Sequence, residues 1–455
     1  MIVSVTEFGA APNTEGIQTG QFQDAIDHCF QQGGGEVIVP GGKYVIGDIR
    51  LRSNITLHLL EDAVLLGSLD PADYQNILRD EVEPLPQAQR TEMEWRLPGP
   101  WQEQGGGFKE YLYCAGSYWN YGMIRAVYAE NVGIIGETGS VIDGRNVYDS
   151  KGEENYRGPH GINMHFCRNV TFKGYTITNT GNWAHAIFQS EKVSFDQLTV
   201  LAGHDALHTR ACSRVSMTNC KLITGDDGIA GFDNIDVIVR DCEISSACSA
   251  FRYGGNHILI ENCHVYGPCK YQFRGHFSKE EKESRAVRSK KARNHMLSFF
   301  TWFVTDDLPQ RKAPGNIVIR NCQVTGADRL LHINLSGNEG WQRGNPPTDI
   351  TFENIEAIGI KTGLYAYGDG IVPYCLYLKN VRYSVAEGLG AEPLIKAAHF
   401  GEINLYDVSV FNYEGNALIK TWSEGGKISA RGLSCRVKDG ELVVRAAEAF
   451  VCDPI

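Results

Sequence analysis

The feature that most constrains this sequence is a repeat with a period of about 22 residues that runs through its centre. Short segments of the form polar–apolar–x–apolar recur, and most of them open with Asn or Asp. They begin at Asn131, Asn169, Lys192, Arg214, Asn234, His257, Asn316, Asp349, Asn380 and Asn404. Most of these segments alternate apolar and polar residues, which is the pattern of a β-strand with one buried face. A short period with strands and turn residues in each unit indicates a solenoid of stacked coils.

A second marker runs in phase with the first and separates two kinds of solenoid. It consists of the pairs Asn219-Cys220, Asp241-Cys242, Asn262-Cys263 and Asn321-Cys322. Leucine-rich repeats need Leu at fixed offsets and often a helical stretch, whereas these units are rich in Val, Ile, Thr and Asn. We therefore expect an all-β fold, a single-stranded right-handed parallel β-helix. Its Cys side chains would stack in the interior, where free thiols behave as small hydrophobic groups.

The open ends of a β-helix must be covered, and the N-terminus carries a segment that can do so. Residues 16–33 have helical spacing and predict a capping helix that ends at Gly33-Gly34-Gly35. We expect its apolar face to hold Phe22, Ile26, Cys29 and Phe30. The alternation of apolar and polar residues continues over 375–455, which predicts coils almost to the end of the chain.

Two stretches interrupt the period and are predicted to be inserted loops, 70–125 and 270–312. The first is rich in aromatic residues. The second contains residues 279–293, with seven Lys or Arg and three Glu. This basic stretch is either a solvated loop or a rim that attracts an acidic substrate. Because no linker rich in Pro or Ser is visible, residues 1–455 are predicted to form one domain.

Composition excludes several classes of protein. The chain is 42% hydrophobic, enough to bury a large core, and it has no apolar run long enough to span a membrane. Its net charge of −11 argues against nucleic acid as a partner. The N-terminus lacks the pattern of a signal peptide, and the 13 Cys are scattered, so we expect a cytoplasmic protein with reduced thiols. The alternative is a secreted protein whose leader has been removed. The sequence leaves the oligomeric state open.

Three carboxylates occur at the spacing of neighbouring coils. Asp205 and Asp226 are 21 residues apart, and Asp227 follows directly. Crowded carboxylates raise the pKa of at least one of them, which can keep an acid protonated beside an ionised base. Glycoside hydrolysis uses such a pair. The alternatives are an Asp ladder that caps turns and a Ca²⁺ site, and the matching Asp one coil earlier favours catalysis.

At these residues the sequence resembles glycoside hydrolase family 28, the polygalacturonases and their relatives. The resemblance covers most of the chain. Its landmarks are Glu7-Phe8-Gly9-Ala10, residues 33–41, residues 53–59, Val141-Ile142-Asp143-Gly144 and Asn182-Trp183-Ala184-His185. The Asn-Thr-Asp motif of the family falls on Gly203-His204-Asp205, where only the Asp is kept. The Gly-Asp-Asp motif falls on Gly225-Asp226-Asp227 and matches in full.

The resemblance implies roles for the three acids. Asp226 would be the general acid, and Asp205 and Asp227 would hold and activate water, so that the anomeric configuration is inverted. Coil spacing by itself points the other way. Coils lie about 4.8 Å apart, whereas inverting carboxylates lie about 6.5–9.5 Å apart and retaining ones about 5–5.5 Å apart. We follow the family and expect inversion.

Two departures from the family pattern concern residues that grip the acidic sugar. Where the resemblance implies a His, 21 residues after Asp227, the sequence has Cys248. The Arg-Ile-Lys motif aligns with Arg274-Gly275-His276, so Arg is kept and Lys becomes His. Arg252 lies near the missing His and is either a replacement for it or a surface residue on a strand.

Two further residues are weaker candidates for substrate contacts. His204 precedes Asp205, and it either packs in a turn or lines the cleft. Trp183 either stacks on a sugar face or belongs to the packed core, as does Trp341.

The sequence as a whole predicts an exo-acting, inverting glycoside hydrolase for a pectin-type oligosaccharide, without a metal or another cofactor. The pectin-type sugar would be derived from galacturonate or rhamnogalacturonan. The alternatives are a glycosidase for a non-pectic sugar, a polysaccharide lyase and a non-catalytic carbohydrate-binding β-helix.

Overall fold

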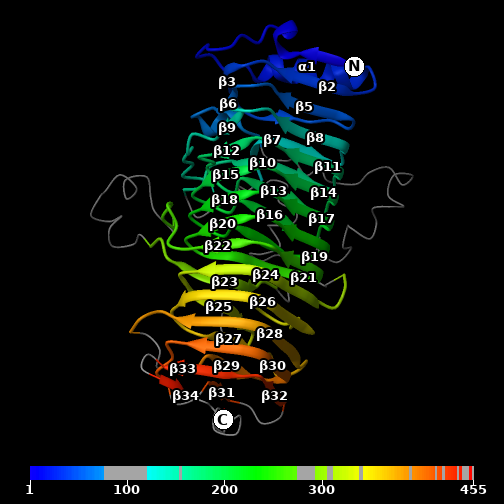
Figure 1. Ribbon diagram of the computed structural model, residues 1–455. Helices are drawn as coiled ribbons and strands as arrows, with labels where there is room; N and C mark the ends of the chain where they lie inside the picture. The colour runs from blue at the N-terminus through cyan, green and yellow to red at the C-terminus, as the bar shows by residue number, and fades with distance from the viewer. Residues whose placement is uncertain are drawn as a thin grey trace. The chain divides into compact units, whose positions relative to one another are not determined.

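The chain divides into two compact units. The computed structural model describes residues 1–75, 120–152, 156–273, 293–304, 311–337, 342–388, 392–415, 418–422, 426–437, 440–442 and 450–452. Unit 1 comprises Met1–Asp226 and Gln272–Arg293, and unit 2 comprises Asp227–Tyr271 and Asn294–Ile455. Figure 1 shows parallel strands in both units. The prediction of a single domain over the whole chain stays a prediction.

The described part of unit 1 contains three helical segments and otherwise consists of short strands. The helical segments are η1 (Val5–Phe8), α1 (Thr19–Gln31) and η2 (Pro71–Asp73). The strands are β1 (Ile2–Ser4), β2 (Gly35–Val39), β3 (Gly42–Ile46), β4 (Ile49–Arg50), β5 (Ile55–Leu59), β6 (Ala63–Gly67), β7 (Gly122–Val127), β8 (Glu130–Gly136), β9 (Val141–Asp143), β10 (His160–His165), β11 (Arg168–Lys173), β12 (Thr176–Thr178), β13 (His185–Phe188), β14 (Glu191–Asp196), β15 (Thr199–Ala202), β16 (Leu207–Arg210), β17 (Ser213–Thr218) and β18 (Lys221–Thr224).

Unit 2 has longer strands. They are β19 (Ile229–Arg240), β20 (Glu243–Ser246), β21 (Ser249–Glu261), β22 (His264–Tyr266), β23 (Met296–Trp302), β24 (Gly315–Thr325), β25 (Ala327–Asn334), β26 (Asp349–Ile360), β27 (Leu364–Tyr367), β28 (Tyr374–Val385), β29 (Ile395–Ala398), β30 (Phe400–Phe411), β31 (Ile419–Thr421), β32 (Lys427–Arg431), β33 (Ser434–Val437), β34 (Gly440–Leu442) and β35 (Phe450–Cys452). The predicted C-terminal coils are therefore confirmed, apart from the antiparallel pair β33–β34.

Strand register within each unit confirms the parallel β-helix. In unit 1, three strands make one coil, and each strand from β2 to β15 pairs in parallel with the strand three positions later. β10, β13 and β16 align Ile162 with His185 and His185 with Leu207. In unit 2, β26 and β28 align Ile355 with Val381 in the same way. Every coil thus repeats the same inward-facing positions, so like side chains stack on one another.

The Asn residues of the repeat occupy a special turn conformation. Asn131 and Asn169 have φ values of 53° and 54°, in the left-handed region that Asn tolerates better than most residues. Their amides also form a ladder, because Asn169 donates to Asn131 and Asn131 donates to Asn54, each over 2.8 Å. The repeated polar residue is therefore set by backbone conformation and by coil-to-coil hydrogen bonds.

Three members of the proposed repeat need correction. Asp236, with φ of 57°, and not Asn234, is the left-handed residue one coil before His257. Asn380 belongs to the second row of markers, where its amide donates to Asn354 over 2.8 Å. Asn404 lies inside β30 opposite Tyr377 and belongs to neither row. These errors arose because neighbouring polar residues fit the same loose pattern.

The Cys marker fills the interior, as predicted. Cys242 and Cys263 are each 2% exposed and Cys322 is 3% exposed, and Cys220 in unit 1 is 2% exposed. In unit 2 each thiol donates to the carbonyl oxygen two residues earlier, over 3.2–3.4 Å. The thiols of Cys242 and Cys322 and burial raise the pKa of Cys263, which keeps it uncharged.

A helix, α1 (Thr19–Gln31), lies within the predicted range 16–33, and its role as a cap stays a prediction. α1 buries Phe22, Ala25, Ile26 and Cys29. Phe30, predicted on the same face, is 44% exposed, and the guanidinium of Arg52 lies 6.0 Å from its ring centre. No helix in the described part of the chain is long and apolar enough to cross a membrane.

The two predicted insertions are shorter than expected. Strand β7 (Gly122–Val127) begins inside the range 70–125, and β23 (Met296–Trp302) lies inside 270–312. β23 pairs in parallel with β21 and β25 and therefore belongs to the coils. Its nearly continuous apolar run lacks the alternation of apolar and polar residues that marks the other strands, because it is buried almost throughout. Residues 76–119 and 274–292 lie outside the described residues.

Candidate active site

Two neighbouring turns of unit 1 carry the first two carboxylates. Asp205 follows β15 and Asp226 follows β18, and these strands pair with Ala202 opposite Thr224. The offset between these coils is therefore 22 residues, not the 21 assumed from the sequence. His204 is then level with Asp226, and Asp205 lies one residue beyond that level. A side chain on Gly225 would place its Cβ 2.6 Å from the carbonyl oxygen of Gly203, so the close approach of the two turns requires glycine.

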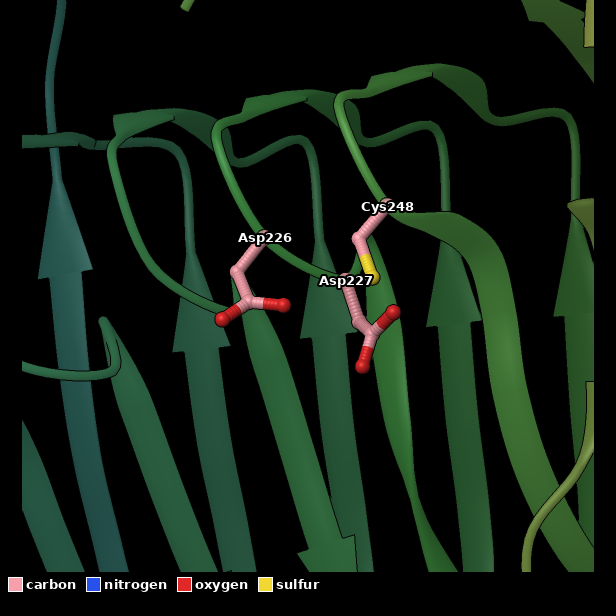
Figure 2. Close-up of side chains that lie close together, drawn as sticks. All are labelled: Asp226, Asp227 and Cys248. Carbon is pink, nitrogen blue, oxygen red and sulfur yellow. The ribbon is translucent and has the colours of Figure 1, made fainter. Parts of the chain in front are cut away.

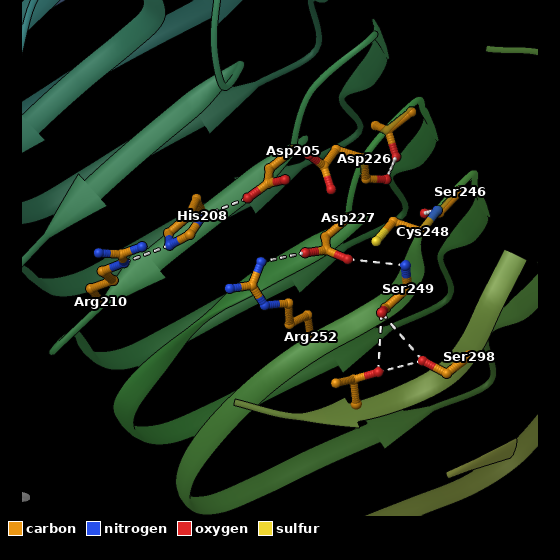
Figure 3. Close-up of polar contacts among 12 residues, drawn as sticks. Asp205, His208, Arg210, Asp226, Asp227, Ser246, Cys248, Ser249, Arg252 and Ser298 are labelled. Atoms are coloured by element: carbon orange, nitrogen blue, oxygen red, sulfur yellow. Dashed lines mark hydrogen bonds and ion pairs between the residues drawn. The ribbon is translucent and has the colours of Figure 1, made fainter. Parts of the chain in front are cut away.

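Asp205 is buried and held by a chain of hydrogen bonds (Figure 3). Oδ2 of Asp205 lies 2.7 Å from Nδ1 of His208, and Nε2 of His208 lies 2.7 Å from Nε of Arg210. Because the guanidinium can only donate, Nε2 of His208 must accept, and Nδ1 then carries the single proton. This arrangement makes His208 neutral and keeps Asp205 ionised.

Trp183 packs beneath this chain. Its ring stacks on His208 with centres 3.9 Å apart and planes 13° apart, and the side chain is 4% exposed. The guanidinium of Arg210 lies 5.3 Å from the same ring. The structure therefore places Trp183 in the packed core, which is the second of the two roles considered from the sequence.

Asp226 is the most accessible of the three carboxylates. Its side chain is 13% exposed, against 3% for Asp205. Nη2 of Arg157 lies 3.8 Å from Oδ2 of Asp226, and Nη1 of Arg157 donates to Oδ1 of Asn182 over 3.1 Å. Sequence reasoning missed Arg157. No pattern in the sequence around Gly158 and Pro159 marks Arg157, because its burial becomes visible only in the structure.

His204 lies in the interior. It is fully buried, and its ring centre is 6.3 Å from that of Tyr156. This position agrees with a packing role in the turn, and its predicted contact with substrate stays a prediction.

Asp227 is the first residue of unit 2, and two hydrogen-bond donors hold its carboxylate (Figure 3). It is fully buried, and its Oδ1 accepts from the backbone N–H of Ser249 over 2.9 Å while its Oδ2 accepts from Nη1 of Arg252 over 3.2 Å. Both contacts favour the ionised form. β19 aligns Ile229 with Phe251 in β21, which is again an offset of 22 residues, so Ser249 and not Cys248 is level with Asp227.

Arg252 belongs to the candidate site and is not an isolated surface residue. Besides its contact with Asp227, its guanidinium lies 4.1 Å from the ring centre of Phe303, and its side chain is 24% exposed. Phe303 packs edge-on against Phe232 with centres 5.0 Å apart. The partly open guanidinium can therefore meet an anionic group while its position is set by a carboxylate and an aromatic face.

Cys248 lies beside Asp227 (Figure 2). A carboxylate oxygen of Asp227 and Sγ of Cys248 are within 4.8 Å, and the backbone N–H of Cys248 donates to Oγ of Ser246 over 2.8 Å. The Ca²⁺ site considered from the sequence as an alternative stays a prediction.

The remaining sequence candidates cannot be placed. Arg274, His276 and Trp341 lie outside the described residues, as does nearly all of the basic stretch 279–293.

Comparisons with known proteins bear on residues 107–247, which match the family model for glycosyl hydrolases family 28. This range includes all three carboxylates and excludes Cys248 and Arg252. A probable polygalacturonase of Vitis vinifera is 25% identical over 239 residues, covering 50% of this chain and 43% of that protein. An exo-poly-alpha-D-galacturonosidase of Dickeya chrysanthemi is 38% identical over 73 residues, covering 16% of this chain and 12% of that protein. The chain spans less than half the length of either relative.

A solved structure supports the fold. The crystal structure of a hyperthermoactive exopolygalacturonase from Thermotoga maritima matches with a TM-score of 0.51 and 16% identity, covering 98% of this chain and 95% of that one. Identity this low shows the fold alone. The right-handed parallel β-helix predicted from the sequence is confirmed.

Proposed function

We propose that this chain, a member of glycosyl hydrolases family 28 through its residues 107–247, hydrolyses glycosidic bonds in an acidic, pectin-type oligosaccharide. The observation that carries the proposal is the difference in environment among three carboxylates. Asp205 and Asp227 are buried and hydrogen-bonded as anions, whereas Asp226 is partly exposed. An acid and a base in distinct environments are what glycoside hydrolysis requires.

The two buried carboxylates suit the task of activating water. Asp205 faces the Nδ1–H of His208, and Asp227 accepts from Ser249 and Arg252. A carboxylate held by such donors is a poor source of a proton, because the donors favour its charged form. It can still orient a water molecule and accept its proton as the transition state forms.

Asp226 is then the candidate general acid. Its greater exposure lets it reach a leaving oxygen, and its neighbour Asp227, an anion joined to it by one peptide bond, favours the protonated form. Arg157 at 3.8 Å has the opposite effect. The hydrogen bond from Oγ1 of Thr224 to the carbonyl oxygen of Asp226, 2.9 Å long, holds the backbone from which the acid projects.

Arg252 is the proposed contact for the acidic group of the sugar. A guanidinium binds a carboxylate through two parallel hydrogen bonds, and the side chain of Arg252 is 24% exposed beside Asp227. This contact would serve in place of the His that the family pattern leads one to expect near Cys248.

Exo action and inversion are further parts of the proposal. The name of the Dickeya chrysanthemi relative supports exo action, and the full Gly225-Asp226-Asp227 motif supports an inverting mechanism. For an α-linked substrate, proton NMR recorded before mutarotation would show the β-anomer as the first product of inversion and the α-anomer as the first product of retention. Analysis of product lengths would separate exo from endo action.

A panel of pectic oligosaccharides and aryl glycosides tests the proposal. We expect a new reducing end and no ultraviolet absorbance from an unsaturated sugar, with the same rate after EDTA treatment. Absorbance from an unsaturated product, with loss of rate in EDTA, would instead identify a lyase. Binding of the oligosaccharides without any cleavage would identify a carbohydrate-binding protein.

A further inference from the structure

Unit 2 carries a strip of aromatic and cationic side chains on strands that stack below one another in Figure 1 (β25, β27, β29 and β31). Alternate residues of these strands are buried, and the intervening ones are partly exposed. The strip, named here the aromatic–basic strip, consists of Arg329, His332, Tyr365, Tyr367, Lys396, Lys420 and Trp422. Its members come from four successive coils of one unit.

Register places these side chains in ordered rows. His332 aligns with Tyr365, Tyr365 with Lys396, and Lys396 with Lys420. In the neighbouring row, Tyr367 aligns with Ala398. Trp422 follows Thr421, which aligns with Ala397, so the small side chain of Ala398 lies between the levels of Tyr367 and Trp422. The rings of Tyr367 and Trp422 meet edge-on across this gap, with centres 5.7 Å apart and planes at 80°.

Cations surround the aromatic rings. The guanidinium of Arg329 and the ammonium of Lys396 lie 4.6 Å and 5.0 Å from the ring centre of Tyr365. The ammonium of Lys420 lies 5.2 Å from the ring centre of Trp422. Lys396 also contacts Glu392. Burial alone would lower the pKa of Lys396, but its hydrogen bond to Glu392 and the nearby Tyr365 outweigh burial and raise that pKa, so Lys396 stays charged.

The strip continues the row that contains Arg252. Arg252 aligns with Thr301 in β23, and Thr301 aligns with His332 in β25. Tyr365 is therefore three coils and Lys420 five coils beyond Arg252, or about 14 Å and 24 Å at a coil spacing of about 4.8 Å. A chain molecule bound at Arg252 and lying along this face would pass over the strip.

We propose that the aromatic–basic strip binds a distal segment of an acidic polysaccharide chain. Aromatic faces stack on the apolar faces of sugar rings, and the cations beside them match carboxylates carried by those rings. The inference rests on the proposed function for the identity of the ligand. It adds a second binding surface in unit 2, three to five coils beyond Arg252, and it predicts that long acidic substrates bind more tightly than short ones.

Direct binding tests the inference without relying on turnover. The Asp226→Asn protein would be titrated by calorimetry with polygalacturonate, with its methyl-esterified form and with galacturonate disaccharide. We expect Lys396→Gln/Lys420→Gln and Tyr365→Ala, each in that background, to weaken binding of polygalacturonate about tenfold, because each removes charge-assisted or stacking contacts. Binding of the disaccharide should stay unchanged, because it is too short to reach the strip.

A matched control comes from another face of the same unit. Lys379 lies 5.9 Å from the ring centre of Tyr377 on β28, so Lys379→Gln removes a similar cation–aromatic pair away from the strip. This variant should bind polygalacturonate like the parent protein. Equal affinity of the strip variants and the parent for polygalacturonate would overturn the inference, as would equal affinity of the parent for the methyl-esterified polymer.

Hydrolysis is measured separately, so the two proposals can fail independently. In the otherwise unaltered protein, the strip variants should raise KM for long acidic chains and leave kcat unchanged. If the unaltered protein cleaves no glycoside while the strip variants still lose binding of long chains, that pair of results would support the strip and contradict the proposed function. Normal cleavage with unaltered binding of long chains would contradict the strip alone.

Discussion

The Nδ1 atom of His208 lies 2.7 Å from Oδ2 of Asp205, and both residues are almost completely buried. With Arg210 donating to its other nitrogen, the imidazole is held as the neutral Nδ1–H form that keeps Asp205 an anion. We therefore expect His208→Ala to lower kcat about 100-fold with little change in KM, because a misplaced base costs rate at this scale. Steady-state kinetics on the substrate found in the panel would measure both constants.

His208→Gln is the matched variant, because its side-chain amide can still donate to Asp205. It should recover part of the lost kcat. Since loss of the partner of a buried carboxylate also destabilises a fold, thermal melting of each variant must accompany the kinetics. Equal activity of His208→Ala and the unaltered protein would remove the positioning role assigned to this residue.

Arg252 is expected to discriminate between acidic and neutral sugars. Arg252→Lys keeps a positive charge near Asp227 but loses the planar fork of donors, so kcat/KM for a galacturonate oligosaccharide should fall about tenfold or more. The methyl-esterified oligosaccharide should be affected less, because it lacks the anionic group. An equal loss on both substrates would show that Arg252 acts only by supporting Asp227.

Gly225 should tolerate no side chain. A Cβ at this position would lie 2.4 Å from the carbonyl oxygen of Gln272, so Gly225→Ala must displace backbone beside Asp226. We expect a loss of several degrees in melting temperature and of most activity. Gly20→Ala is the control, because nothing lies within 4 Å of its added Cβ and Ala is favoured over Gly inside α1. A melting temperature for Gly225→Ala as high as that of the control would contradict the close packing of these turns.

Acid should unfold the protein through its buried histidines. Burial, with a smaller contribution from the charge of His160, lowers the pKa of His165 from 6.5 to about 3, and burial lowers the pKa of His185 to about 3. The unfolded chain therefore binds more protons than the folded one between these values. The contribution of these histidines to the free energy of unfolding is fully present above about pH 6.5. It falls by roughly 1.4 kcal/mol per pH unit per histidine as the pH drops toward 3.

Urea unfolding across pH 4–7 measures this dependence. His165→Gln removes one of the two titrating groups while keeping a donor for Oδ1 of Asn163, which His165 approaches at 2.9 Å. Its free energy of unfolding should depend less steeply on pH than that of the unaltered protein. Identical slopes would mean that the pKa of His165 is the same in the folded and unfolded chains, which would contradict the lowered value.

Much of the fold was predictable because the coils repeat their constraints. Asn131 and Asn169 mark the left-handed turn, and Cys242 and Cys263 mark the interior, so period and strand class follow from spacing. β23 was missed because a strand buried on both faces loses its alternation. Arg157 was missed because its position beside Asp226 depends on chain segments distant in sequence, a contact that no local pattern encodes.

The candidate site was predictable as a set of residues but not as a geometry. The acids Asp205, Asp226 and Asp227 followed from coil spacing, yet an error of one residue in the offset placed Cys248 where Ser249 lies. Because side chains alternate faces along a strand, one residue of slip changes which group meets the carboxylate. Trp183 shows the same limit: its place in the core depends on stacking with His208, which spacing does not reveal.

The proposed mechanism depends on Asp226 as the general acid, and the dependence of rate on the leaving group tests that role. An acid catalyst matters most when the departing alcohol is a poor leaving group. We predict that Asp226→Asn abolishes hydrolysis of a natural oligosaccharide but retains much of its rate on an activated nitrophenyl glycoside of the same sugar, whereas Asp227→Asn loses both. The decisive measurement is the kcat/KM of folded Asp226→Asn on the natural oligosaccharide. A loss of at least about 100-fold is the expected result, and full activity would contradict the mechanism.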